Sequence, residues 1–195
     1  MVFEIAWWAH AVLILCFMNY LPYSKHLHVL TSIPNVFLGP LAPSNAMQPI
    51  NFEEEGVEKF GIVDIEDMSW KTLLDGYTCT HCGRCTSVCP ANQTGKVLDP
   101  RGIMIAIHDR TMDKAPLIVK QQNNETLTAE EQAVWDKKLI GDYINPDALW
   151  ACTTCGACMQ ECPVNIEHVP AIVGMRRSMV MMESMFNDES ALLPD

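Results

Sequence analysis

The stretches CTHCGRCTSVCP at residues 79–90 and CTTCGACMQECP at residues 152–163 share one spacing, C-x2-C-x2-C-x3-C-P. They contain eight of the nine cysteines in this chain of 195 residues. Cysteines two residues apart are poorly placed to form disulfides with one another, so metal binding is the better interpretation in a reducing compartment. Structural zinc is the alternative, but zinc sites use two separated C-x2-C pairs rather than four cysteines in one loop. The two stretches therefore predict two metal centres.

The spacing is the one found in bacterial proteins that hold two 4Fe–4S clusters. Three cysteines on a tight loop can bind three corners of a cubane, and the fourth begins the next helix and reaches the other cluster. Gly83 and Gly156 stand where each loop must turn sharply. His81 and Arg84 are interpreted as surface residues, with tuning of the cluster potential as the alternative. We expect crossed ligation, with the first cluster on Cys79, Cys82, Cys85 and Cys162 and the second on Cys152, Cys155, Cys158 and Cys89.

The N-terminal region is apolar over residues 5–21, IAWWAHAVLILCFMNYL. These 17 residues carry no full charge and come near the lower limit for a membrane span. A signal peptide is the alternative, but it would begin with basic residues, and this chain begins with Glu4. We therefore predict a transmembrane helix, with aromatic residues near both ends.

Charge is distributed unevenly along the chain. All but one of the 24 acids and all but one of the 13 lysines and arginines lie after residue 50, and the formal net charge is −11. An acidic domain is repelled by nucleic acid, which argues against a DNA or RNA partner. Lys25, which follows the span, places that end on the cytoplasmic side by the positive-inside rule.

The remaining sequence favours helices, and no run alternates well enough to predict a sheet. Helix starts are expected after Ser69, at Asp99-Pro100 and at Thr128, where Glu131 completes a capping box. A last helix is expected over residues 167–186. Residues 27–41 are too short and broken for a second span and are expected to run along the membrane interface, and residues 39–49 form a linker. The fold class is all-α, with one transmembrane helix (1–30), an interfacial segment and linker (31–50), and a helical two-cluster ferredoxin domain (51–195).

Two histidines of the N-terminal region are 18 residues apart, His10 and His28. In one continuous helix they would share a face about 27 Å apart along the axis, with His26 facing away. This placement suits two b-type haems near opposite membrane faces, although Pro22 lies between them and ordinary interfacial histidines are an equal alternative.

The stretch WWAHAVLILCFMNYLPYSKHLH resembles the haem-bearing span of the cytochrome b (gamma) subunit of respiratory nitrate reductases. The rest resembles heterodisulfide-reductase-related membrane iron–sulfur oxidoreductases, which include electron-transfer-flavoprotein:menaquinone oxidoreductases. The stretches that carry this second resemblance are FGIVDIEDMSWKTLLDGYTCTHCGRCTSVCPA, LWACTTCGACMQECPVNIEHV and MRRSMVMMESMF. The resemblance implies that His10 and His28 bind different haems, each completed by a histidine from another transmembrane helix. That family also has further spans and a CCG-type cysteine-rich module, so this chain is expected to be a fragment or a split subunit.

The predicted function is membrane-anchored electron transfer between a soluble donor, such as a flavoprotein, and b-type haem or the quinone pool. The catalytic centre is expected outside this chain. The protein itself is expected in a bacterial or archaeal cell membrane, with the iron–sulfur domain on the cytoplasmic side. One alternative is a non-catalytic iron–sulfur protein whose clusters act as a redox sensor or as structural elements. Another is a soluble dehydrogenase subunit whose apolar N-terminus does not span a membrane. The direction of electron flow stays open.

Overall fold

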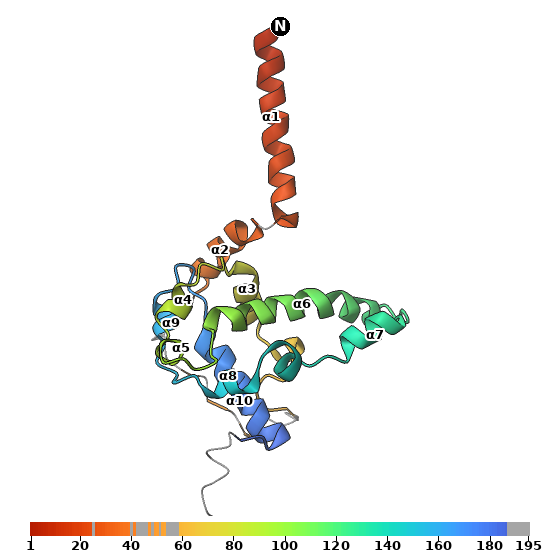
Figure 1. Ribbon diagram of the computed structural model, residues 1–195. Coiled ribbons are helices and arrows are strands. Elements are labelled where there is room, and N and C mark those ends of the chain that lie inside the picture. The colour runs from red at the N-terminus through yellow and green to blue at the C-terminus, as the bar shows by residue number, and fades with distance from the viewer. Residues whose placement is uncertain are drawn as a thin grey trace, which may run out of the picture.

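A computed structural model of the protein describes residues 1–24, 26–39, 41, 47, 49–50, 52–53 and 59–186. Within these residues the chain is helical, and β-structure is limited to a single bridge between Ile140 and Ile144. The expected all-α class is therefore confirmed. The first long helix stands apart from a domain built of the other helices (Figure 1).

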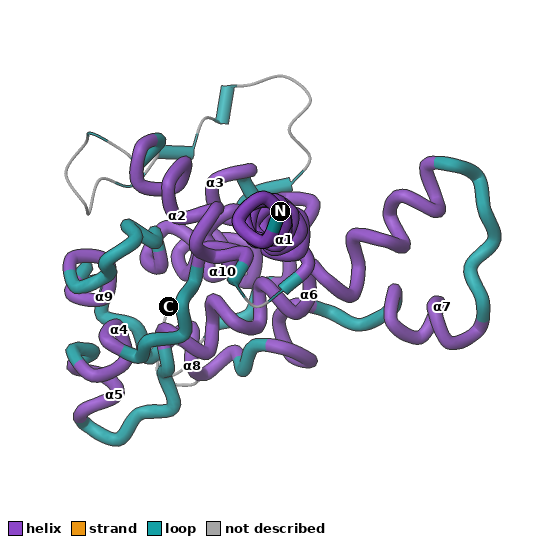
Figure 2. Tube along the Cα trace, turned by 90° about the horizontal axis from the view of Figure 1, so that it is seen from above, coloured by secondary structure: helices purple, strands orange, loops and turns teal. Residues whose placement is uncertain are grey.

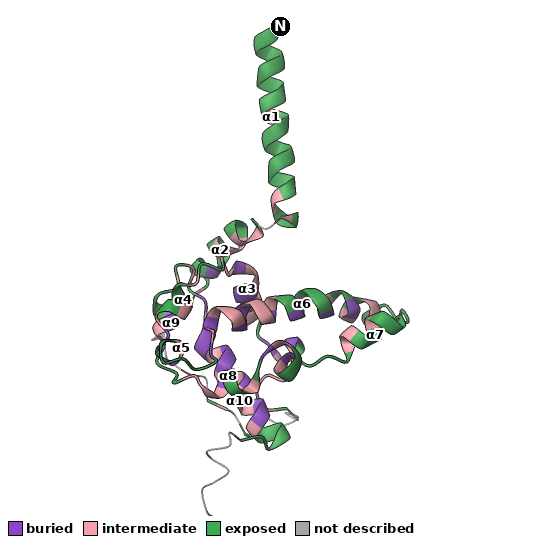
Figure 3. Ribbon diagram, in the orientation of Figure 1, coloured by how far each residue is buried: buried purple, intermediate pink, exposed green. Residues whose placement is uncertain are grey.

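The N-terminal helix α1 spans Val2–Tyr20 and buries none of its residues. With the following 3-10 turn η1 (Leu21–Tyr23) it forms a 22-residue apolar segment that is long enough to cross a membrane. Its surface is exposed along its whole length (Figure 3). A helix that is apolar on every side, and none of whose residues is buried by the described part of the chain, requires an apolar surrounding. This feature agrees with the predicted transmembrane helix.

The expectation of one continuous helix from His10 to His28 is wrong. Pro22 lies in η1, and Ser24 has an extended backbone with ψ 168°. The Ser24 hydroxyl then accepts a hydrogen bond from His26 N at 3.2 Å, and a new helix, α2, spans Leu27–Phe37. His10 and His28 therefore lie on different helices, and the argument that they share one face does not hold. The rings of His26 and His28 lie 6.3 Å apart instead of pointing in opposite directions.

Helix α2 packs against α3 (Trp70–Thr78) with its polar side facing the domain. Asn35 is fully buried there, and Thr31 contacts the Tyr77 carbonyl, whereas the side chains on the other side are apolar and exposed. These exposed side chains are Val29, Leu30, Ile33, Val36 and Phe37. The predicted linker (39–49) and the start of the ferredoxin domain at residue 51 lie largely outside the described residues.

The centre of the domain is α6, Pro100–Gln122, against which α3 and α10 (His168–Glu183) pack. Fully buried apolar side chains from α6 and the segment before it, from α8 (Pro146–Trp150) and from α10 form the core. They include Leu98, Met104, Ile107, Leu149, Ile172 and Met175. The expected helix starts at Ser69, Asp99 and Thr128 are all confirmed by capping hydrogen bonds. The last helix ends at Glu183, three residues earlier than expected, where Ser184 adopts a left-handed conformation.

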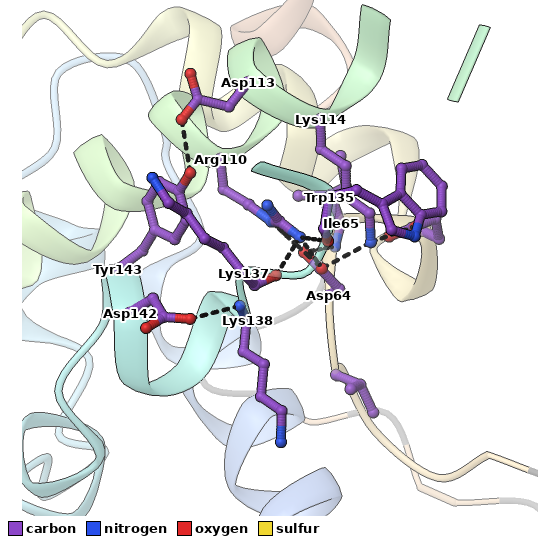
Figure 4. A network of polar contacts seen from close by, with 12 residues as sticks. Asp64, Ile65, Arg110, Asp113, Lys114, Trp135, Lys137, Lys138, Asp142 and Tyr143 are labelled. Atoms are coloured by element: carbon purple, nitrogen blue, oxygen red, sulfur yellow. Dashed lines mark hydrogen bonds and ion pairs between the residues drawn. The ribbon is translucent and has the colours of Figure 1, made fainter. Parts of the chain in front are cut away.

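A buried ion network holds the middle of α6 (Figure 4). Arg110 is fully buried and donates to Asp64, with Nη2 2.7 Å from Oδ2, and to the Val134 carbonyl beside α7 (Ala129–Trp135). Lys114 contacts the same carboxylate at 2.7 Å. Burial raises the pKa of Asp64, but the hydrogen bonds from Arg110 and Lys114 outweigh it and hold that pKa below its usual value. The network is structural, because it ties η2 (Ile65–Asp67) and the α7 region to α6.

The short helices of the cysteine motifs lie together at the end of the domain that is opposite to α7. Helices α4 (Arg84–Ser87), α5 (Pro90–Gln93) and α9 (Ala157–Gln160) lie together, far from α7, in both views (Figures 1 and 2). The two motifs, 73 positions apart in register, thus meet at one end of the domain near α2.

Candidate iron–sulfur centres

The first cysteine cavity combines residues from both motifs. Three cysteines of the first motif line it together with the fourth cysteine of the second motif, as crossed ligation predicts. Arg84, Arg101 and His168 are the side chains in its lining that carry basic groups. The cysteines are Cys79, Cys82, Cys85 and Cys162.

The second cysteine cavity has the reciprocal composition. Three cysteines of the second motif line it with the fourth cysteine of the first motif. The other side chains of its lining are mostly apolar, and they come from the segment before α6 and from α10. The cysteines are Cys152, Cys155, Cys158 and Cys89, and the apolar residues are Leu98, Pro100, Val169 and Ile172.

The backbones of the two motifs repeat each other closely. Gly83 and Gly156 both adopt the left-handed conformation, with φ 79° and 76°, at the starts of α4 and α9. The sharp turn expected at these glycines is thereby confirmed. The residues two positions earlier, His81 and Thr154, also have positive φ, 53° and 55°. Thr154 N then donates to Cys152 Sγ at 3.4 Å, so the loop directs backbone N–H groups at sulfur.

Cysteines of one motif raise the pKa of cysteines of the other motif. Burial raises the pKa of Cys79, and the nearby Cys162 raises it further. Burial raises the pKa of Cys85 to about 11 and that of Cys158 to about 12. The charge of Cys85 is among the causes that raise the pKa of Cys158, because the two cavities lie side by side. Iron must therefore displace protons from the buried thiols when it binds.

The cavities fit cubanes better than single ions. Among the residues that the structure describes, no three Cys, His, Asp or Glu side chains converge closely enough to hold one metal ion. A zinc ion would require sulfurs about 2.3 Å from a common centre. A 4Fe–4S cluster presents four separate iron corners, which suits cysteines spread around a cavity. All eight cysteines are free of disulfides.

A third cavity, which we call the junction cavity, lies where the apolar N-terminal segment meets the domain. Its volume is about 680 Å³, within the range of cofactor and ligand sites. Four of the six histidines line it: His26, His28, His81 and His108. His10 lies elsewhere, on α1. Cys79 lines both the junction cavity and the first cysteine cavity, so the two cavities adjoin.

A buried polar cluster connects α2 to the loop that follows Cys162. Asp75 is fully buried and accepts hydrogen bonds from Asn35 Nδ2 at 2.8 Å, Lys71 Nζ at 2.6 Å and Glu167 N at 3.1 Å. Asn35 also donates to the Val164 carbonyl at 2.9 Å. Burial raises the pKa of Asp75 despite the hydrogen bond from Lys71. The helix that follows the apolar N-terminal segment is thereby fixed to the first cysteine cavity.

Sequence reasoning found the cysteines but missed the side chains around them. Arg101 carried no signal beyond its place after Asp99-Pro100, and Arg176 lay within an apolar-looking helix. Arg176 donates to the carbonyls of Leu149, Trp150 and Cys152, the last being the first cysteine of its motif. His108 has no motif around it in the sequence, and it lines the junction cavity. Asn35 fell in a segment expected only to run along an interface.

Comparisons with known proteins identify the class. Residues 75–166 match the family described as a 4Fe-4S dicluster domain. The chain is 34% identical over 210 residues to the probable iron-sulfur-binding oxidoreductase FadF of Bacillus subtilis, covering 97% of this chain and 30% of that protein. It is 37% identical over 191 residues to the EtfAB:quinone oxidoreductase of Syntrophomonas wolfei, covering 92% of this chain and 26% of the relative. No solved structure matches.

Shorter matches extend the same relationship. A probable membrane-anchored ferredoxin of Chromohalobacter salexigens is 34% identical over 63% of this chain and 19% of its own length. One subunit of the ferredoxin:CoB-CoM heterodisulfide reductase of Methanosarcina mazei is 32% identical over 53% of this chain and 46% of its own length.

The chain therefore contains a 4Fe-4S dicluster domain. It is homologous to membrane-associated iron–sulfur oxidoreductases related to heterodisulfide reductase, as the sequence resemblance predicted. It spans less than a third of the length of the first two relatives.

Proposed function

We propose that this protein passes electrons between a soluble donor and a redox carrier in the membrane, through two clusters held by crossed cysteine sets. When bound, the clusters supply two one-electron carriers. The observation that carries the proposal is the position of Cys79, which lines both the first cysteine cavity and the junction cavity. A ligand of the first cluster therefore borders the space nearest the membrane segment.

The orientation of the domain follows from α2. Its polar side faces the domain through Asn35 and Thr31, and its apolar side is exposed. This pattern is the reverse of a helix on the surface of a soluble domain. It suits a helix whose outer side contacts lipid or other transmembrane helices at the end of α1. The positive charge of Lys25 supports the cytoplasmic side for the clusters.

The junction cavity is the proposed place of exchange with the membrane carrier. His28 would bind one b-type haem there, and His10 on α1 would bind a different haem. Each haem would need a second histidine from another transmembrane helix. Since α1 and α2 are separate helices, this assignment now rests on the sequence resemblance and on the position of His28, not on a shared helical face. Quinone is the further carrier, as the name of the Syntrophomonas wolfei relative states for that protein.

The other partners are proposed from the relatives. A soluble flavoprotein is the class of donor that the name EtfAB:quinone oxidoreductase implies for that relative. A CCG-type module or subunit would hold the catalytic centre, outside this chain. The acidic domain, with formal net charge −11 for the whole chain, would meet a donor surface of opposite charge.

Metal analysis tests the cluster content directly. Anaerobically purified protein should contain about eight iron and eight sulfide per chain, since each cubane holds four of each. Bound zinc without visible charge-transfer absorption would overturn the proposal.

The haem assignment needs the complete complex and three matched variants. Reduced-minus-oxidised spectra should show that His10→Ala and His28→Ala each remove one of two b-type signals. His26→Ala is the matched control, because His26 lines the same cavity as His28. If only His26→Ala changes the haem content, the assignment of His10 and His28 is wrong.

A further inference from the structure

Arg101 has an unusual place at the first cysteine cavity. It lies in the first turn of α6 and lines that cavity. Its guanidinium reaches over the first motif, because Nη1 lies 3.9 Å from where a Cβ atom on Gly83 would be. Nη2 forms a loose ion pair with Asp99 Oδ2 at 3.7 Å.

The Nε atom of Arg101 is buried, and within the described part of the chain it has no hydrogen-bond partner. Leaving a buried donor without a partner costs about 1–3 kcal/mol, and such atoms are rare in folded proteins. An acceptor that belongs in the adjacent cavity would remove this cost. Cluster sulfides and cysteine thiolates are acceptors of that kind.

The second cysteine cavity lacks this arrangement. Arg176 contacts the backbone of its first cysteine: Nε donates to the Leu149 carbonyl at 2.8 Å, and Nη2 donates to the carbonyls of Trp150 and Cys152. These donors are occupied by backbone. The lining of the second cavity carries Leu98, Val169 and Ile172 but no charged side chain among the described residues.

We propose that Arg101 donates its Nε–H to a sulfur of the first cluster and thereby makes that cluster the easier of the two to reduce. The proposal rests on the crossed ligand sets given above. A hydrogen bond to sulfur favours the reduced state, which carries one more negative charge. No bond is made or broken: the electron that leaves the second cluster is the one that the first cluster gains. An electron that enters from the soluble donor is therefore held mainly on the first cluster, beside the junction cavity.

Redox titration followed by electron paramagnetic resonance tests the proposal on intact protein in detergent. Arg101→Lys keeps the charge but removes the planar Nε–H donor, and Arg101→Gln removes both. Each variant should lower the reduced-to-oxidised ratio of the first cluster about tenfold at fixed ambient potential, or about 59 mV for one electron. The second cluster should change less than threefold. Lys96→Gln is the control, since Lys96 is an exposed cation outside the lining of both cysteine cavities, and it should change either ratio less than threefold.

Unchanged potentials in both Arg101 variants would overturn the proposal, and so would a wild-type potential in Arg101→Lys, because charge alone would then suffice. A second measurement needs no variant. Wild-type protein labelled with 15N in the arginine guanidinium, and poised so that one cluster is reduced, should show a 15N hyperfine coupling. Its absence would overturn the proposal.

Iron analysis and redox titration of the same samples distinguish a failure of the role proposed for Arg101 from a failure of the proposed function. Protein with eight iron and two clusters of equal potential would contradict only the role of Arg101. Protein without two cubanes would contradict the proposed function and the role of Arg101 together.

Discussion

The two cysteine cavities have nearly the same ligand loops and very different surroundings. Their glycines share φ values of 79° and 76°, and each cavity draws three cysteines from one motif and one from the other. The first cavity, however, has Arg101 and His168 in its lining and adjoins the junction cavity, whereas the second is enclosed by aliphatic side chains. The motif therefore determines the arrangement of the cysteines, and the helices packed around it give the two cavities different linings.

The largest effect on stability is expected from Arg176, which supports the second cysteine cavity. Arg176→Leu would leave the carbonyls of Leu149, Trp150 and Cys152 without their charged donor. Because hydrogen bonds to charged groups contribute about 1.5–3 kcal/mol each, we expect a loss of about 4 kcal/mol in the free energy of unfolding. Denaturant unfolding with iron analysis should show that the second cluster is lost first. Preferential loss of the first cluster would contradict the assignment of Arg176 to the second cavity.

Asp75 stabilises the region of the first cavity, as Arg176 does for the second. Asp75→Asn leaves Lys71 buried without its close partner and weakens the contact to Glu167 N, so we expect a loss of about 3 kcal/mol. The control is the double variant Asp75→Leu with Lys71→Met, which removes both charges and should cost clearly less than the single change. Denaturant titration of both proteins measures the difference. Equal losses would show that the ion pair does not matter.

His168 should make the first cavity sensitive to pH. Burial lowers its pKa to about 4, against an ordinary value of 6.5, so the folded protein keeps the ring neutral while the unfolded chain takes up a proton. The stability from this residue is fully present above pH 6.5 and falls as the pH drops toward 4. Between pH 6.5 and 5 the loss should be about 2 kcal/mol.

Denaturant unfolding at several pH values measures this effect, with His168→Gln as the variant that should abolish this part of the dependence. Among its described lining residues the second cavity has no histidine. An unchanged pH dependence in His168→Gln would exclude a role for this ring.

The motif glycines should give the smallest and most equal effects. Gly83→Ala and Gly156→Ala both place a Cβ atom on a left-handed backbone, which costs about 1–2 kcal/mol. Because the two loops have the same conformation, the two losses in unfolding free energy should agree within about 0.5 kcal/mol. A clear difference would show that the surroundings also alter the loops.

The sequence predicted those features that depend on local chemistry. Cysteine spacing, the glycine turns and the caps at Ser69, Asp99 and Thr128 are decided within a few residues, and the structure contains them. The prediction of a helix that continues past Ser24 was wrong, because a single Pro22 in an apolar run can either kink a helix or end it.

The surroundings of the cavities could not be read from the sequence, because they come from long-range packing. Arg101 reaches the first cavity only because α6 begins beside the first motif, and His108 reaches the junction cavity only because α6 passes α3. Asn35 and Asp75 form their hydrogen bond across 40 positions in the chain. No periodicity or motif links such residues.

Crossed ligation is tested most directly by the fourth cysteine of the second motif. Cys162→Ser should give the same residual cluster spectrum by electron paramagnetic resonance as Cys82→Ser, because both residues line the first cysteine cavity. Cys89→Ser should likewise match Cys155→Ser. If Cys162→Ser instead matches Cys155→Ser, each motif holds its own cluster and the crossed assignment is wrong.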